Sequence, residues 1–320
     1  MPLVDMPMKE LRAYNGVNPR PADFDAYWED ALAEMHALGT DAELVPSPFQ
    51  VPGAECFDLY FTGVGGARVH AKYLRPADGK RPAPCVLCFH GYTGSAGDWA
   101  DKLSFVSMGF AVMAMDARGQ GGSSEDLTPV KGTTLNGHII RGLDDAPEKL
   151  LFRSVFLDTA QLARIAMARE EIDGTRVAAC GGSQGGALTV ACAALEPGIV
   201  RLAPEYPFLS DYKRTWEMDL ATDAYAELRT FFRHHDPLHL REEELFTKLG
   251  YIDIQYLAHR IRGKVLWGVG LMDTICPPST QFAAYNKITA PKQLLVYPDF
   301  GHEGLPGFND AAHSFFAELL

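Results

Sequence analysis

A chain of 320 residues, of which 47% are hydrophobic, can bury a sizeable core in one large α/β domain or in two small ones. Its formal net charge of −12 argues against a nucleic acid or an anionic membrane as the main partner, because both are bound by clustered Lys and Arg. No signal-peptide pattern opens the chain, and no apolar run reaches the roughly 18 residues of a membrane span. We therefore expect a cytoplasmic protein that acts on a neutral or cationic small molecule.

The first part of the chain predicts a helical extension followed by a hairpin. We expect the extension over residues 1–50, where residues 23–28 belong to a polar, helix-compatible stretch that leads into a proline-punctuated linker. Residues 57–61 and 69–74 flank a glycine-rich turn and are rich in strand-forming side chains. They predict an antiparallel hairpin.

Beyond the hairpin, short apolar runs alternate with helical stretches, as is typical of buried parallel strands. We predict these strands at residues 85–89, 110–115, 176–180, 264–269 and 293–297. The expected fold is an α/β fold with a mostly parallel central sheet, flanked by helices and preceded by the antiparallel hairpin. Residues 208–260 fit this alternation poorly, and we expect a helical insertion over the active-site face of a single domain spanning 1–320.

The six cysteines are expected to be reduced, since most lie in apolar segments where a thiol behaves as a small hydrophobe. Cys85 and Cys88 form a CxxC pattern. In an extended strand an offset of three places the two side chains on opposite faces, which works against a disulfide or a metal site between them.

Ser183 has the sequence context of a catalytic nucleophile. It lies in the run GGSQGG at residues 181–186, directly after a predicted strand and before the helix-forming residues 187–195. A strand, a GxSxG motif and a helix in this order form a nucleophile elbow. Gly181 and Gly185 are needed because the turn is sharp and a side chain there would strike neighbouring backbone.

A serine nucleophile requires a base, and His302 is the best placed of the ten histidines, just beyond the last predicted strand. The acid that orients the base is expected after the preceding strand, where Asp273 lies. Asp299 is a rival, but it precedes His302 by only three residues, where a tight turn is its more natural use.

An acyl-transfer site also needs backbone amides that bind the oxyanion of the tetrahedral intermediate. The residue after the nucleophile, Gln184, supplies one. The loop at residues 90–94 follows an early strand, and we expect the second amide, and a contact with the substrate, from Tyr92.

Two other patterns predict structural roles. The glycine-rich residues 116–123 lack the Gly-Lys-Ser/Thr of a phosphate-binding loop, and we expect a buried Arg118 to pair with an acid or with loop carbonyls and brace the oxyanion region. His234, His235 and His239 suggest metal binding, but a proline interrupts the helix that would align the last two. We expect no metal and no other cofactor.

With these residues in view, the sequence resembles the acetyl xylan esterase and cephalosporin C deacetylase family, carbohydrate esterase family 7, of the α/β-hydrolase fold. The resemblance is carried by HGY at residues 90–92, RGQ at 118–120, GGSQG at 181–185 and HE at 302–303, in that order. It extends over essentially the whole chain.

The resemblance implies a serine esterase that removes acetyl groups from small acetylated carbohydrates, such as xylo-oligosaccharides, and from cephalosporin C. It places the nucleophile, acid and base on Ser183, Asp273 and His302, and the oxyanion amides on Tyr92 and Gln184. It also implies a ring-shaped homo-hexamer. Two alternatives stay open, a peptidase or thioesterase of the same fold and a catalytically silent binding or scaffold protein.

Overall fold

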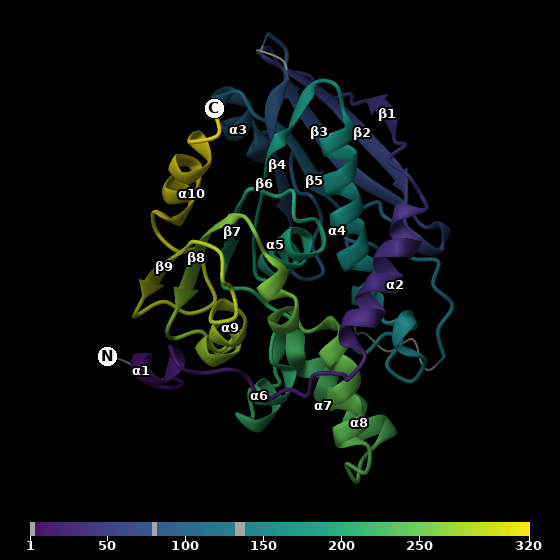
Figure 1. Cartoon of the computed structure of the whole chain (residues 1–320), viewed down its shortest axis with the longest axis vertical. Helices are drawn as coiled ribbons and strands as arrows, with labels where there is room; N and C mark the ends of the chain where they lie inside the picture. Colours follow the sequence, from purple (N-terminus) through teal and green to yellow (C-terminus); the bar gives the residue numbers. More distant parts are fainter. Residues whose placement is uncertain (1–3, 79–81, 132–137) are drawn as a thin grey trace.

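A single sheet organises the protein (Figure 1). The computed structural model describes residues 4–78, 82–131 and 138–320; residues 1–3, where the predicted extension begins, lie outside this description, as do 79–81 and 132–137. The nine strands of the described residues have the spatial order β1-β2-β3-β5-β4-β6-β7-β8-β9. Their bounds are β1 Glu43–Pro46, β2 Ala54–Thr62, β3 Arg68–Pro76, β4 Ala83–Phe89, β5 Ala111–Met115, β6 Ile172–Gly182, β7 Arg201–Glu205, β8 Lys264–Gly270 and β9 Lys292–Tyr297.

The pairing of the strands confirms the predicted fold class. The strands from β5 through β4 to β9 pair in parallel, whereas β1, β2, β3 and β5 pair in antiparallel fashion. All five residues of β5 are buried, which is why its sequence is a continuous apolar run rather than an alternating one. The predicted hairpin is β2 and β3, which place Phe57 opposite Tyr73.

Two strands were not predicted, and each has a local reason. β1 is a short edge strand of four residues in the segment that we expected to be helical, and three of its residues are exposed. β7 carries Pro204, which cannot donate a ladder hydrogen bond. β7 and β8 accordingly pair at Leu202 and again at Glu205, and the two residues of β7 between these positions have no partner in β8.

Helices cover both faces of the sheet. Buried residues of α2, α4 and α5 belong to one apolar cluster, and those of α3 and α10 belong to a second cluster on the opposite face. The helices are α1 Met8–Leu11, α2 Phe24–His36, α3 Leu103–Met108, α4 Leu151–Ala168, α5 Gln184–Leu195, α6 Tyr212–Glu217, α7 Ala226–His235, α8 Glu242–Leu249, α9 Pro278–Tyr285 and α10 Phe308–Ala317. None of the helices in the described ranges has the length and apolar character needed to cross a membrane.

The chain between β7 and β8 contains α6, α7 and α8. Figure 1 shows these three helices together at one end of the molecule, beyond the strands of the sheet. They are held there by buried aromatic packing, in which Trp216 of α6 contacts Phe232 of α7 and Phe246 of α8 with ring centroids 4.6 and 6.4 Å apart.

A buried ion pair joins the loop after β5 to helix α4. Both Arg118 and Asp158 have fully buried side chains, and two hydrogen bonds of 2.7 and 2.6 Å connect the guanidinium to the carboxylate. Arg118 also donates to the carbonyl oxygen of Val64 at 3.0 Å. The predicted pairing of a buried Arg118 with an acid and a loop carbonyl is confirmed.

Replacing Arg118 with Met should destabilise the protein strongly, because Asp158 then stays buried without its partner. We expect a loss of about 3–5 kcal/mol in the free energy of unfolding. The double variant Arg118→Met/Asp158→Leu removes both charges and should recover much of this loss. Urea denaturation followed by circular dichroism measures both variants, and a double variant less stable than the single one would contradict the expectation.

Candidate active site

Ser183 occupies a strained turn between β6 and α5. Its backbone has a φ of 56° and a ψ of −120°, a conformation that residues with a side chain rarely adopt. The Ser183 amide donates to the carbonyl oxygen of Glu205 at 3.0 Å, so β7 holds the turn in place. The sharp turn expected from the sequence is present, and it lifts the hydroxyl out of the sheet.

The glycines on either side of Ser183 are required by close backbone contacts. A Cβ atom on Gly181 would lie 2.5 Å from the carbonyl oxygen of Phe89, and one on Gly185 would lie 2.1 Å from the same oxygen. Real Cβ atoms do not approach oxygen so closely. The strand β6, the helix α5 and the end of β4 can therefore meet only where both positions are glycine.

Three predicted site residues come together in one hydrogen-bonded chain. The His302 Nε2 atom lies 2.9 Å from the Ser183 hydroxyl oxygen, and its Nδ1 atom lies 2.8 Å from Asp273 Oδ2. They follow β6, β8 and β9, strands whose carboxyl ends share one edge of the sheet. Histidine in this arrangement can accept the serine proton at Nε2 while the carboxylate accepts a hydrogen bond from Nδ1.

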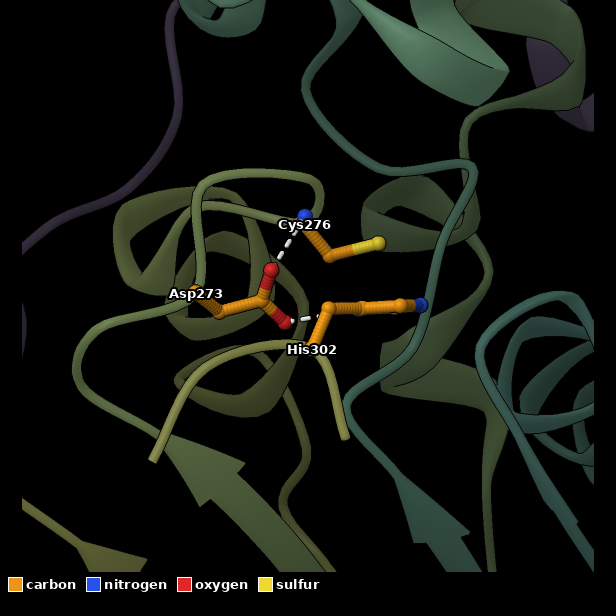
Figure 2. Close-up of side chains that lie close together, drawn as sticks. All are labelled: Asp273, Cys276 and His302. Carbon is orange, nitrogen blue, oxygen red and sulfur yellow. Dashed lines mark hydrogen bonds and ion pairs between the residues drawn. The ribbon is translucent and has the colours of Figure 1, made fainter. Parts of the chain in front are cut away.

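The carboxylate of Asp273 is buried and fixed by its own loop. Its Oδ1 atom accepts hydrogen bonds from the amides of Ile275 and Cys276, at 2.9 and 2.8 Å, and this leaves Oδ2 for His302. Figure 2 shows the two oxygens turned in these two directions. The rival Asp299 is exposed and lies outside this chain of contacts.

Cys276 is a neighbour of the site that sequence reasoning treated as an ordinary core thiol. Ligand-type atoms of Asp273, Cys276 and His302 lie within 4.8 Å of one another (Figure 2). Burial raises the pKa of the Cys276 thiol well above its ordinary value, and a hydrogen bond with Ser183 opposes that rise. These ligand atoms are near enough to one another to hold a metal ion, but His302 Nδ1 and Asp273 Oδ2 are already hydrogen-bonded to each other. In the sequence, the only sign that Cys276 lies at the site was its position three residues after the predicted acid, Asp273.

The turn after β4 carries Tyr92, one of the two predicted oxyanion donors. The amide of Gly94 donates to Gly91 O at 3.1 Å, and the amide of Thr93, whose φ is 60°, donates to Gln120 Oε1 at 2.9 Å. The amide of Tyr92, the donor predicted from the sequence, is not one of these two engaged amides and stays the candidate donor of this turn for an oxyanion.

The second candidate donor is the amide of Gln184, which opens helix α5 and has no acceptor within the helix. The buried Gln184 side chain exchanges two hydrogen bonds with Gln120, of 2.8 and 3.0 Å. Gln120 therefore links the elbow to the turn that carries Tyr92. We expected Arg118 to brace this region, but its bonds go to α4 and to Val64, and Gln120 makes the contacts instead. Sequence reasoning missed Gln120, although it is the third residue of the RGQ motif.

Aromatic rings border the site. Tyr206 packs against the His302 ring with centroids 4.7 Å apart, and Tyr92 packs edge-on against Phe208 at 5.3 Å. The Tyr92 hydroxyl oxygen accepts a hydrogen bond from the His138 amide at 3.2 Å. These ring contacts give the surroundings of His302 and Tyr92 a partly apolar character.

Comparison with known proteins gives concordant results. Residues 1–319 match the family model described as acetyl xylan esterase (AXE1). The structure of acetyl xylan esterase 1 from Thermoanaerobacterium sp. JW/SL YS485 is 58% identical, with a TM-score of 0.96 over 98% of this chain and 99% of that one. The acetyl xylan esterase from Paenibacillus sp. R4 is 34% identical, with a TM-score of 0.93 over 98% of this chain and 100% of that one.

A relative of different length is also similar. Acetyl esterase Axe7A from Xylanibacter ruminicola is 28% identical over 285 residues, which make up 87% of this chain. The aligned region spans 62% of the length of that relative. The family match over nearly the whole chain and the two closely similar structures lead to one conclusion: the chain belongs to the acetyl xylan esterase family, and its sheet has the α/β-hydrolase fold.

Proposed function

We propose that the protein is a serine carboxylic-ester hydrolase that removes acetyl groups from small acetylated carbohydrates such as xylo-oligosaccharides. The observation that carries the proposal is the chain of hydrogen bonds from Ser183 through His302 to Asp273 at a strained turn. The names of the relatives, acetyl xylan esterase and acetyl esterase, support acetyl as the acyl group. Cephalosporin C as a second substrate and the homo-hexamer stay predictions of the resemblance.

In the first half of the reaction, Ser183 Oγ attacks the acetyl carbonyl while His302 Nε2 takes its proton. Asp273 keeps the other ring nitrogen protonated and stabilises the imidazolium that forms. The amides of Tyr92 and Gln184 bind the oxyanion of the tetrahedral intermediate.

In the second half, His302 returns the proton to the departing sugar hydroxyl and leaves an acetyl group on Ser183. A water molecule that gives its proton to the same ring nitrogen then attacks the acetyl-enzyme, the bond between Ser183 Oγ and the acetyl carbon breaks, and acetate leaves as His302 returns the proton to Oγ. Every step uses side chains of the chain and water, so the mechanism requires no metal or organic cofactor.

Ser183→Ala should abolish hydrolysis of p-nitrophenyl acetate, because no other group at the elbow can form the acetyl-enzyme. We expect a fall in kcat of about 10⁴-fold or more. The variant should keep the melting temperature of the wild type or exceed it, since alanine removes no buried contact of the core. Wild-type protein should react with a fluorophosphonate probe, whereas failure to react would favour the scaffold alternative.

Asp273→Asn and Asp299→Asn form a matched pair that separates the two candidate acids. The first substitution favours the wrong tautomer of His302 and should lower kcat on the order of 10⁴-fold. The second changes an exposed carboxylate and should leave kcat within about twofold of the wild type. Equal effects of the two substitutions would remove Asp273 from the proposed role.

A panel of substrates distinguishes the acetyl esterase from a peptidase or thioesterase. We expect kcat/KM to be highest for acetyl and propionyl p-nitrophenyl esters and to fall with longer acyl chains, because the aromatic rings of Tyr92, Tyr206 and Phe208 border the site. Aminoacyl anilides and acetyl thioesters should be turned over more slowly than acetylated xylobiose. A higher rate on anilides or thioesters would overturn the proposed leaving group.

A further inference from the structure

Cys88 and Cys180 lie side by side on the two central strands that carry the active-site loops. They are directly paired residues of the parallel strands β4 and β6, and their sulfur atoms are 3.8 Å apart. Cys85 belongs to the apolar cluster on the other face of the sheet, which confirms that the CxxC pattern does not bring its own two thiols together. The partner of Cys88 comes from a different strand.

These two thiols differ from the other four in access. Cys88 and Cys180 are half-buried, whereas the other cysteines, Cys56, Cys85, Cys192 and Cys276, are buried. A cavity of about 260 Å³ between helices α3 and α10 is lined by Cys180, whose sulfur lies 3.8 Å from that of Cys88. Its lining mixes apolar side chains such as Phe105 with polar ones such as Ser104 and His313, so a small molecule that enters it arrives next to the pair.

The surroundings also favour a reactive form of one thiol. The hydrogen bond with Cys180 lowers the pKa of the Cys88 thiol, and the positive charge of Lys102 acts in the same direction. The same contact raises the pKa of Cys180, so Cys88 is the more readily ionised of the two thiols. A more acidic thiol next to a less acidic partner is the arrangement of a nucleophilic and a resolving cysteine.

We propose that Cys88 and Cys180 form an oxidation site at which hydrogen peroxide converts the two thiols into a reversible disulfide. Neighbouring strands are separated by about 4.8 Å, which lies within the range of Cα separations of about 4.4–6.8 Å that a disulfide can bridge. The sulfurs have to approach by rotation of the two side chains and a small shift of the strands.

The chemistry balances with one peroxide per pair. The Cys88 thiolate attacks one peroxide oxygen, an S–O bond forms as the O–O bond breaks, and hydroxide leaves. The Cys180 sulfur then attacks the sulfenic sulfur of Cys88, the S–O bond breaks, and the thiol proton leaves with the oxygen as water. Two thiols are oxidised and one peroxide is reduced, and a dithiol reductant reverses the reaction.

The position of the pair gives oxidation a consequence for activity. Cys88 lies four residues before Tyr92, and Cys180 lies three residues before Ser183. Drawing the sulfurs to bonding distance strains the two strands just before the oxyanion turn and the elbow. Because a misplacement of about 1 Å can lower a rate on the order of 100-fold, we expect oxidation to lower turnover about tenfold or more. This last step rests on the proposed esterase function, whereas the disulfide itself does not.

Peptide mass spectrometry tests the site directly. The full-length protein is treated with hydrogen peroxide, its remaining thiols are alkylated, and it is digested without reduction. We expect a peptide pair linked through Cys88 and Cys180, lighter by two hydrogen atoms than the sum of the free peptides. The link should be lost in Cys88→Ser and in Cys180→Ser but kept in Cys85→Ser, a matched control in the same strand. Recovery of Cys88 as sulfinic acid without the link would overturn the proposal.

The activity of each variant, relative to its own untreated sample, tests the consequence. Peroxide should inactivate the wild type and Cys85→Ser, a dithiol should restore both, and Cys88→Ser and Cys180→Ser should resist. Cys276→Ser distinguishes the thiol beside the triad: peroxide sensitivity that disappears in this variant but persists in Cys88→Ser would assign the loss of activity to Cys276 and overturn the regulatory consequence. A link that forms while turnover stays unchanged would overturn the regulatory consequence alone. If the Ser183→Ala variant showed that the proposed esterase function is wrong, the mass-spectrometric result would still show whether Cys88 and Cys180 form a disulfide.

Discussion

The close contact between the carbonyl oxygen of Phe89 and the glycines around Ser183 is the constraint on which the site depends. Strand β4 ends at this oxygen, and both Gly181 and Gly185 must lack a side chain for β6 and α5 to pass it. The contact fixes how closely the turn at Ser183 approaches the end of β4. The turn that follows β4 begins at the same point, so Ser183 and the turn that carries Tyr92 are positioned by one steric fit.

Hydrogen bonds hold the side chains on both sides of Ser183 in place. On one side Asp273, held by two backbone amides of its own loop, aligns His302 with Ser183. On the other side Gln120 bonds both to Gln184 and to the turn that carries Tyr92. Each group that would meet the substrate is thus oriented by a partner with its own fixed geometry, which is what electrostatic preorganisation requires.

The sequence predicted the structure correctly where a residue pattern is compatible with only one local structure. The run GGSQG after an apolar strand can hardly form anything but a sharp turn, and continuous apolar runs such as β5 have the pattern of strands buried on both faces. It failed where the decisive contact comes from elsewhere in the chain. The short edge strand β1, the proline-containing β7 and the bonds of Gln120 depend on partners more than 10 residues away, which local pattern does not reveal.

The RGQ motif shows how a short loop can serve the core and the site at once. Arg118 points inward to the buried Asp158 of α4, while Gln120 points outward to Gln184 at the elbow. The buried ion pair anchors the start of this loop, and the side chain two residues later is held by its own hydrogen bonds to the buried Gln184. Residues 118–120 therefore connect helix α4 to the turn that carries Tyr92, and we expect loss of the ion pair to disturb the contacts of Gln120.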